Sequence, residues 1–304
     1  MTNARIVEPG LPVFLTRRTV CRFYLLRPDR ELTESFLYCL AVAAEEFGVL
    51  VHSACVMSTH VHLVITDVRG VYPDFLRRLN RLFANSTKVL RGWGHEVFNA
   101  SGPSAVLLRT PGAVVDKCAY TVANPVACGA VKSHRDWPGF VTRVEDMGKL
   151  RRTVKRPAWY FAEDGDMPES AELRIELPPA LVELHGEEKA RRLVAESLEA
   201  KEKEARAEVR ARGHVFLGAE RVKKASPYKR AKAYEVFGAL DPNWATTGGG
   251  KQAYLEEAER YRTFQATYRV SWDRWASGDR DVVFPYGTWL MRERHGARCA
   301  EPPS

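Results

Sequence analysis

Long apolar runs are missing from this chain, and we expect no secretory leader at its N-terminus. None of its apolar segments reaches the roughly 18–20 residues that a helix needs to cross a bilayer. Its first residues lack the basic region followed by an apolar stretch that marks a secretory signal. We therefore expect a cytoplasmic protein with no membrane partner.

The six cysteines lack the spacing of a zinc site or a redox pair. No C-x-x-C motif occurs, and most of the cysteines lie in apolar stretches. Free thiols in a reducing compartment are the expected state.

Positive charge is concentrated in one half of the chain. The formal net charge is +8. Residues 1–160 hold 22 Lys and Arg against 13 Asp and Glu, whereas residues 161–304 hold 24 against 25. A basic half is typical of proteins with a polyanionic partner, most often nucleic acid, although many basic proteins bind no polyanion.

Strand and helix patterns alternate in the first half of the chain. The predicted elements are a strand-rich stretch at 13–26, a helix at 32–47, strands at 49–57 and 60–67, a helix at 72–93, a strand at 105–109 and a helix at 113–124. Pro125 is expected to end the third helix, because the residue before a proline disfavours the helical conformation. The order predicts an α+β fold with a ferredoxin-like split βαβ core. The third helix would then pack near the sheet face opposite the two long helices or at an edge of the sheet, close to residues 60–62.

The second half is expected to be an appendage to this core. We predict a catalytic domain at 1–160 and a mostly helical C-terminal extension at 161–304. Residues 186–212 are dominated by charge and predict a solvated helix. Residues 246–251 (TTGGGK) lack the first glycine and the final Ser or Thr of a phosphate-binding loop, so we interpret them as a flexible linker. Aromatic residues at helical spacing between 254 and 275 are expected on a buried helix face, with base stacking on nucleic acid as the alternative.

A histidine pair is the strongest chemical signal. His60 and His62 flank Val61 in an alternating strand pattern. Their side chains therefore share one sheet face, with the two residues about 6–7 Å apart along the backbone, while Val61 points to a core. Two imidazoles on rigid backbone can bind one metal ion, although such a pair can also be structural or merely exposed.

The third predicted helix carries a second polar set. Lys117, Tyr120 and Asn124 stand at i, i+3 and i+7 and therefore lie on one helix face. Tyr120 alone could be a core residue with a satisfied hydroxyl, and Asn124 could serve as a helix C-cap.

These stretches together resemble one family. Residues 57–64 (MSTHVHLV), 120–126 (YTVANPV) and 136–139 (DWPG) are similar to the HUH single-tyrosine transposases of insertion sequences, and within them to the REP-associated tyrosine transposases. The resemblance implies an HUH core in which His60, His62 and Asn124 bind the metal and Tyr120 is the nucleophile. It also implies a bacterial, nucleoid-associated protein that acts on single-stranded, hairpin-forming DNA, in some members as a homodimer.

The implied chemistry is consistent with the residue types. A tyrosine hydroxyl has an ordinary pKa near 10 and is a poor nucleophile unless its target is activated. Two neutral imidazoles and an amide oxygen leave about three octahedral positions for phosphate oxygens and water, which suits Mg²⁺ or Mn²⁺. Attack by Tyr120 would give a 5′-phosphotyrosine and a free 3′-hydroxyl.

A basic stripe on the second predicted helix is a further candidate. Arg77, Arg81, Lys88 and Arg91 fall in one narrow sector of the helix. They are candidate DNA contacts, together with Lys117, although such a stripe is often only a solvated face.

Two other functions remain open. Ser58, Thr59 and Ala127 replace residues that are usual in the family, so the chain could be a DNA-binding regulatory protein that has lost cleavage. A metal-dependent phosphodiesterase that uses activated water would not need Tyr120.

Overall fold

The computed structural model describes residues 4–232 and 242–302. Its helices and strands are, in chain order, β1 Leu11–Arg18, α1 Arg30–Phe47, β2 Val49–Met57, β3 His60–Asp67, α2 Tyr72–Arg91, β4 Ser104–Leu108, α3 Pro111–Ala127, β5 Leu150–Lys155, β6 Ser170–Ile175, α4 Pro179–His185, α5 Glu187–Ala211, α6 Ala219–Lys224, β7 Trp244–Ala245, α7 Gly250–Ala276, β8 Val283–Phe284, α8 Trp289–His295 and β9 Arg298–Cys299. Short 3₁₀ turns lie at 20–22, 134–136 and 144–146. Within the described part of the chain, no helix has the length and apolar character needed to cross a membrane.

The central sheet has the strand order β2-β3-β1-β4, with every one of these pairs antiparallel. This order, with α1 between β1 and β2 and α2 between β3 and β4, is the ferredoxin-like split βαβ arrangement. The predicted fold class is therefore confirmed. The short strand β7 extends the sheet beyond β4 in parallel orientation, so the C-terminal half contributes to the core sheet.

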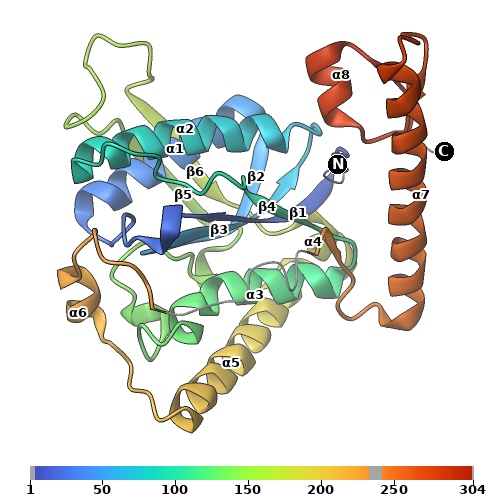
Figure 1. The fold of residues 1–304 in the computed structure, drawn as a ribbon. Helices are drawn as coiled ribbons and strands as arrows, with labels where there is room; N and C mark the ends of the chain where they lie inside the picture. The colour runs from blue at the N-terminus through green and yellow to red at the C-terminus, as the bar shows by residue number, and fades with distance from the viewer. Residues whose placement is uncertain (1–3, 233–241, 303–304) are drawn as a thin grey trace.

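Helices cover both faces of the sheet. α1 and α2 lie on one face, and α3 lies on the other with α5 packed beneath it (Figure 1). α1 begins where the Asp29 side chain accepts the Leu32 N–H, and it ends at Gly48, whose φ of 65° suits a residue without a side chain. The expected position of the third helix, opposite the two long helices, is confirmed.

Two predictions about α3 and the turn before α7 are wrong. α3 continues through Pro125 to Ala127, and the missing proline N–H costs only one hydrogen bond in the last turn. Residues 246–251 are no free linker, because they form the turn into α7 and pack on the first turn of α3. There the Thr110 hydroxyl donates to the Thr247 carbonyl at 2.7 Å, and Gly112 approaches the same carbonyl so closely that a side chain would collide with it.

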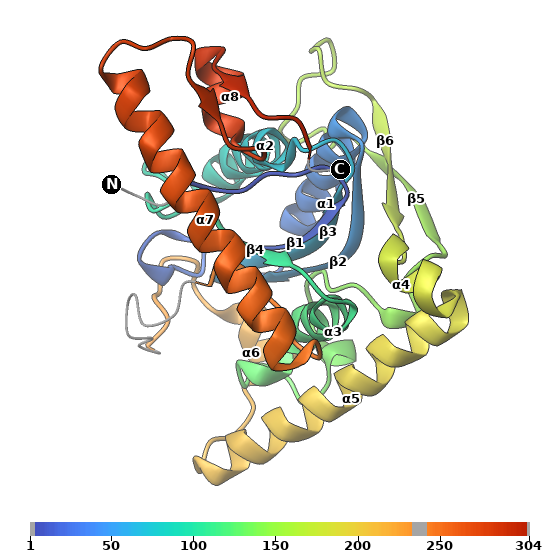
Figure 2. The same ribbon diagram turned by 90° about the vertical axis from the view of Figure 1, so that its right-hand side faces the viewer.

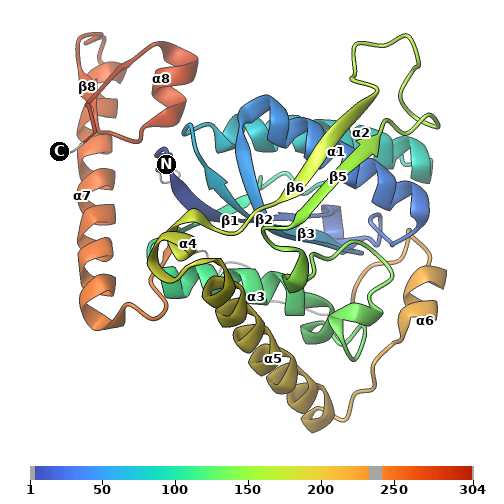
Figure 3. The same cartoon turned by 180° about the vertical axis from the view of Figure 1, so that it is seen from behind.

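The C-terminal half is built onto the core. β5 and β6 form an antiparallel hairpin along the α1 side of the molecule (Figure 3), so residue 160 lies inside a hairpin. The α5 helix is charged on its outer face, as predicted, but buries a full stripe against α3: Ala190, Val194, Leu198, Glu202, Ala205 and Val209.

α7 crosses the β4 edge of the core (Figure 2). Of the aromatic residues on α7, Tyr268 and Trp275 pack on buried Phe284, whereas Tyr254 is 55 % exposed and contacts Trp244.

Candidate active site

The histidine pair lies on the α3 face of strand β3. The His60 and His62 ring centroids are 4.6 Å apart, closer than the spacing of about 6–7 Å between alternate residues along a strand. Val61 points to the opposite face, where it meets the core between the sheet and helices α1 and α2. His62 is buried and His60 is partly exposed.

Both imidazoles are held through the same ring nitrogen by a threonine. Thr59 Oγ1 lies 2.9 Å from His60 Nδ1, and Thr16 Oγ1 lies 2.9 Å from His62 Nδ1. Thr16 sits opposite His62 in the β1–β3 register. When each Nδ1–H donates to its threonine, each Nε2 offers its electron pair to a metal ion, which is the usual arrangement of a metal-binding histidine. In the other tautomer, His60 Nε2–H donates to the Asn124 Oδ1 and His60 Nδ1 accepts from Thr59. Sequence reasoning missed Thr16, because only strand pairing brings it to His62.

Asn124, on helix α3, is the third predicted metal ligand. Its Oδ1 lies 2.9 Å from His60 Nε2, and the Cys128 thiol also reaches this oxygen at 3.5 Å. The C-cap of α3 is Cys128, so the Asn124 side chain is turned to the histidines and does not cap the helix. Asn124 is 3 % exposed.

Tyr120 stands one helical turn before Asn124 and faces the same strand. Its ring lies edge-on to His62, with centroids 5.4 Å apart, and edge-on to Phe14 at 5.7 Å. The Phe14 ring also stacks on His62 at 5.1 Å. The tyrosine is partly exposed, so its position is fixed by aromatic contacts while it remains open to solvent.

Lys117 brings positive charge to Tyr120, and the carboxylate that pairs with Lys117 is shared with a lysine of helix α5. The Lys117 ammonium lies 5.3 Å from the centre of the Tyr120 ring and 3.1 Å from Asp116. Lys201 of α5 binds the same carboxylate at 2.6 Å. Burial alone would raise the pKa of Asp116, but the Lys201 hydrogen bond and the Lys117 charge outweigh it and hold the pKa below its usual value. Because Asp116 is shared, it neutralises Lys117 only in part.

The electrostatics around His62 favour a neutral imidazole. Burial lowers the pKa of His62 well below its ordinary value, and the charges of His60, Arg18 and Lys117 lower it further. A neutral ring is the form that binds a metal. The 2.9 Å between His60 Nε2 and Asn124 Oδ1 also fits two adjacent ligands of one octahedral ion, which lie about 3 Å apart when each bond is about 2.1 Å. The residues present therefore fit a Mg²⁺ or Mn²⁺ ion.

The candidate metal ligands include an amide, that of Asn124. Among residues 4–232 and 242–302, no cluster of three or more His, Cys, Asp or Glu side chains could hold a metal ion. His60, His62 and Asn124 thus combine two nitrogen donors with one neutral oxygen.

The predicted basic stripe on α2 is not part of the candidate active site. α2 covers the sheet face opposite α3, so Arg77, Arg81 and Lys88 lie on the far side of the sheet from the histidines (Figure 1). Arg77 and Arg81 are exposed, and Lys88 lies 3.5 Å from Glu96.

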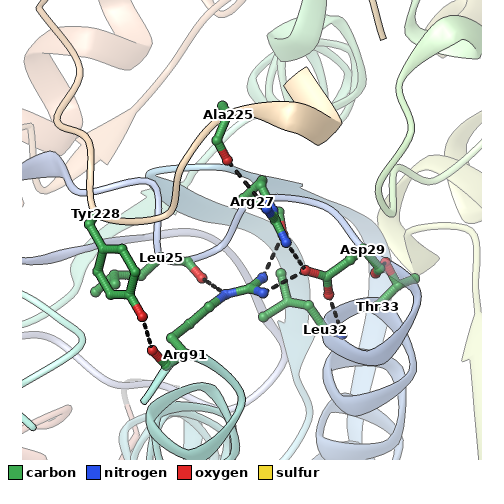
Figure 4. A network of polar contacts seen from close by, with 8 residues as sticks. All are labelled: Leu25, Arg27, Asp29, Leu32, Thr33, Arg91, Ala225 and Tyr228. Atoms are coloured by element: carbon green, nitrogen blue, oxygen red, sulfur yellow. Dashed lines mark hydrogen bonds and ion pairs between the residues drawn. The ribbon is translucent and has the colours of Figure 1, made fainter. Parts of the chain in front are cut away.

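Arg91 does not share the surface of the other three. Its guanidinium is buried and donates to the carbonyl oxygens of Leu25 and Arg27 at 2.9 and 2.7 Å and to Asp29 at 2.5 Å (Figure 4). Arg91 therefore joins the end of α2 to the start of α1 and is occupied as a structural residue. Helical spacing correctly predicted the side of α2 on which Arg91 lies. It could not show that the loop containing Leu25 and Arg27 covers the guanidinium.

Comparison with known proteins gives structural neighbours only. The sequence matches no protein-family model, and it matches none of the curated proteins. Six chains of solved structures match in fold. One is a REP-associated tyrosine transposase bound to a REP hairpin, at 18% identity and a TM-score of 0.42, over 57% of this chain and 98% of that one. Another is a presumed transposase of Deinococcus radiodurans, at 22% identity and a TM-score of 0.28, over 35% of this chain and 85% of that one.

Proposed function

We propose that this protein cleaves single-stranded DNA near a hairpin and transfers the cut strand through a covalent 5′-phosphotyrosine, with Mg²⁺ or Mn²⁺ as cofactor. The observation that carries the proposal is one cluster on the α3 face of the sheet. There His60, His62 and Asn124 can bind one ion, and Tyr120 stands beside them with Lys117 at its ring.

Each residue has a separate task in this reaction. The Tyr120 oxygen attacks the scissile phosphorus and the P–O3′ bond breaks; the hydroxyl proton of Tyr120 passes to solvent, and the departing 3′ oxygen takes a proton from solvent to become a 3′-hydroxyl. His60, His62 and Asn124 would hold the ion, which would supply Lewis-acid stabilisation of the phosphate charge. Lys117 adds positive charge where the attacked phosphate gains negative charge. The reverse attack by a 3′-hydroxyl then releases Tyr120 and joins the strands, so no ATP is consumed.

Adduct formation tests the proposal directly. Purified protein is incubated with Mn²⁺ and hairpin DNA that carries a single-stranded flank and a label on the fragment 3′ of the expected cut. A denaturing gel should show labelled protein for the wild type and for Tyr254→Phe, which changes an exposed tyrosine on α7. Tyr120→Phe should abolish the adduct. An adduct that survives Tyr120→Phe contradicts the nucleophile assignment.

The same gel separates the other functions. DNA binding without cleavage would identify a regulatory protein on this fold, and cleavage without an adduct would identify a water-using phosphodiesterase. Thr59, one of the unusual residues before the first histidine, holds His60 Nδ1 at 2.9 Å, which favours a retained active site. Mixing Tyr120→Phe with His60→Ala protein tests whether Tyr120 acts across a homodimer, since adduct reappears only if the tyrosine acts on the partner's site.

A further inference from the structure

We propose that residues 217–232, which we name the strap, form a second DNA-binding surface next to the candidate active site. This inference rests on the proposed function and gives part of the C-terminal extension a role in it. The partner is the phosphate backbone and unpaired bases of the DNA strand that enters the site.

The first end of the strap is attached beside Asn124. Backbone N–H groups of Leu217 and Gly218 donate to the carbonyls of Gly129 and Ala130, at 3.1 and 2.9 Å, just after the end of α3. Val222 of α6 is buried in a small apolar cluster with Met57 and Trp137. Met57 is three residues before His60, so α6 sits at the end of the sheet where the candidate site lies.

The second end of the strap is attached to the loop at residues 19–27. Tyr24 N–H donates to the Lys229 carbonyl at 2.9 Å, and Ala231 N–H donates to the Arg22 carbonyl at 3.0 Å. The same loop holds the turn before His60, because Thr19 N–H reaches the Thr59 carbonyl at 2.8 Å. Backbone groups make these attachments, so the basic side chains of the strap are not used for them.

The strap is strongly basic. It carries six Lys and Arg and one carboxylate, Glu220, and all six cations are exposed: Arg221, Lys223, Lys224, Lys229, Arg230 and Lys232. Within the described part of the chain, Lys223 alone among the six forms an ion pair, with Glu220. A run of exposed and largely unneutralised cations is the electrostatic signature of a phosphate-binding surface.

Aromatic rings accompany this charge. The Tyr228 ring is 53 % exposed and stacks on Trp93, with centroids 6.2 Å apart and planes at 25°. Its hydroxyl donates to the Arg91 carbonyl, which fixes the ring (Figure 4). The Arg230 guanidinium lies 4.5 Å above the Phe23 ring. A fixed, exposed ring among cations suits base stacking on single-stranded nucleic acid, whereas binding to a membrane surface would call for an exposed apolar helix face.

Binding without cleavage tests the inference. The probe is a fluorescein-labelled hairpin oligonucleotide with a single-stranded flank, titrated in EDTA and followed by fluorescence anisotropy between 50 and 200 mM salt. The strap variant carries Lys224→Gln, Lys229→Gln and Lys232→Gln. The control variant carries Lys251→Gln, Arg262→Gln and Arg269→Gln, three exposed cations on α7 at the opposite end of the molecule (Figure 1).

The strap variant should bind roughly ten-fold or more weakly at 100 mM salt, and the slope of log K against log salt should fall by about 2, while the control keeps both values. Tyr228→Leu should weaken binding of the single-stranded flank roughly ten-fold and leave a blunt duplex unaffected. The inference is overturned if the strap variant binds within two-fold of the wild type, or if the control variant loses as much affinity.

Failure of the proposed function gives a different result. Because the titration contains no divalent ion, it is unaffected by loss of cleavage, and Tyr120→Phe should bind like the wild type. A strap that binds DNA in a protein that forms no adduct leaves this inference standing and overturns the phosphotyrosine proposal. An adduct that forms equally well in the strap variant at limiting DNA overturns the inference and leaves the proposed function standing.

Discussion

Thr16 and Thr59 offer a sensitive test of the metal site, because they hold equivalent ring nitrogens in unequal surroundings. Thr16→Val keeps the shape of the side chain and removes the oxygen that lies 2.9 Å from His62 Nδ1. His62 is 4 % exposed, so water cannot replace the lost partner. Thr59→Val makes the same change beside His60, which is partly exposed and can be hydrated.

The magnitude follows from this difference in burial. Removing the partner that orients a metal-binding histidine typically lowers metal affinity 10–100-fold, which corresponds to about 1.4–2.7 kcal/mol. A buried donor left without a partner costs about 1–3 kcal/mol by itself. We therefore expect Thr16→Val to weaken Mn²⁺ binding by 10–100-fold and Thr59→Val to weaken it only several-fold.

The assay is a titration of protein with Mn²⁺ in the absence of DNA, with free Mn²⁺ measured by its electron paramagnetic resonance signal. Adduct formation at increasing Mn²⁺ provides a second readout, in which the half-saturating concentration should rise and the maximal rate should recover. Unfolding midpoints of both variants serve as the control for stability. Equal effects of the two substitutions, or unchanged Mn²⁺ affinity in Thr16→Val, would refute the reasoning.

Three further predictions concern stability and charge. Burial lowers the pKa of His52 from 6.5 to about 4, so between these pH values the unfolded chain binds a proton that the folded chain does not. The contribution of His52 to the free energy of unfolding should be fully present above pH 6.5 and fall by about 3 kcal/mol toward pH 4. Urea unfolding of His52→Gln should lack this loss. Lys201→Met leaves Asp116 paired with Lys117 alone, so Asp116 neutralises more of the Lys117 charge. Adduct formation should then slow about five-fold, the equivalent of about 1 kcal/mol. Asp116→Asn in the same background should restore the rate, and an unchanged rate in Lys201→Met contradicts the argument that Asp116 is shared. Gly112→Ala should lower the free energy of unfolding by about 1–3 kcal/mol, because its methyl group meets a backbone carbonyl, and an unaffected thermal midpoint would count against the packing of residues 246–251 on α3.

Local patterns in the sequence predicted the core correctly. The strands at 49–57 and 60–67 match β2 and β3 residue for residue, because alternation of apolar side chains is a property of neighbouring residues. The order of elements was enough to predict the ferredoxin-like sheet. The histidines, Tyr120 and Asn124 were identified from residue type and spacing, and the structure brings these side chains together. Their chemical roles stay predictions.

Tertiary structure alone decided how that site is supported and what surrounds it. Thr16 reaches His62 across 46 positions of sequence through strand register, and no local pattern reports register. Arg91 has the spacing of an exposed stripe, yet a loop from 64 residues earlier covers it. The strap lies next to the candidate site only because backbone hydrogen bonds join it to two loops that are distant in sequence, at residues 129–130 and 22–24. Periodicity determines which elements form, whereas contacts between them depend on a packing that the whole chain must find at once.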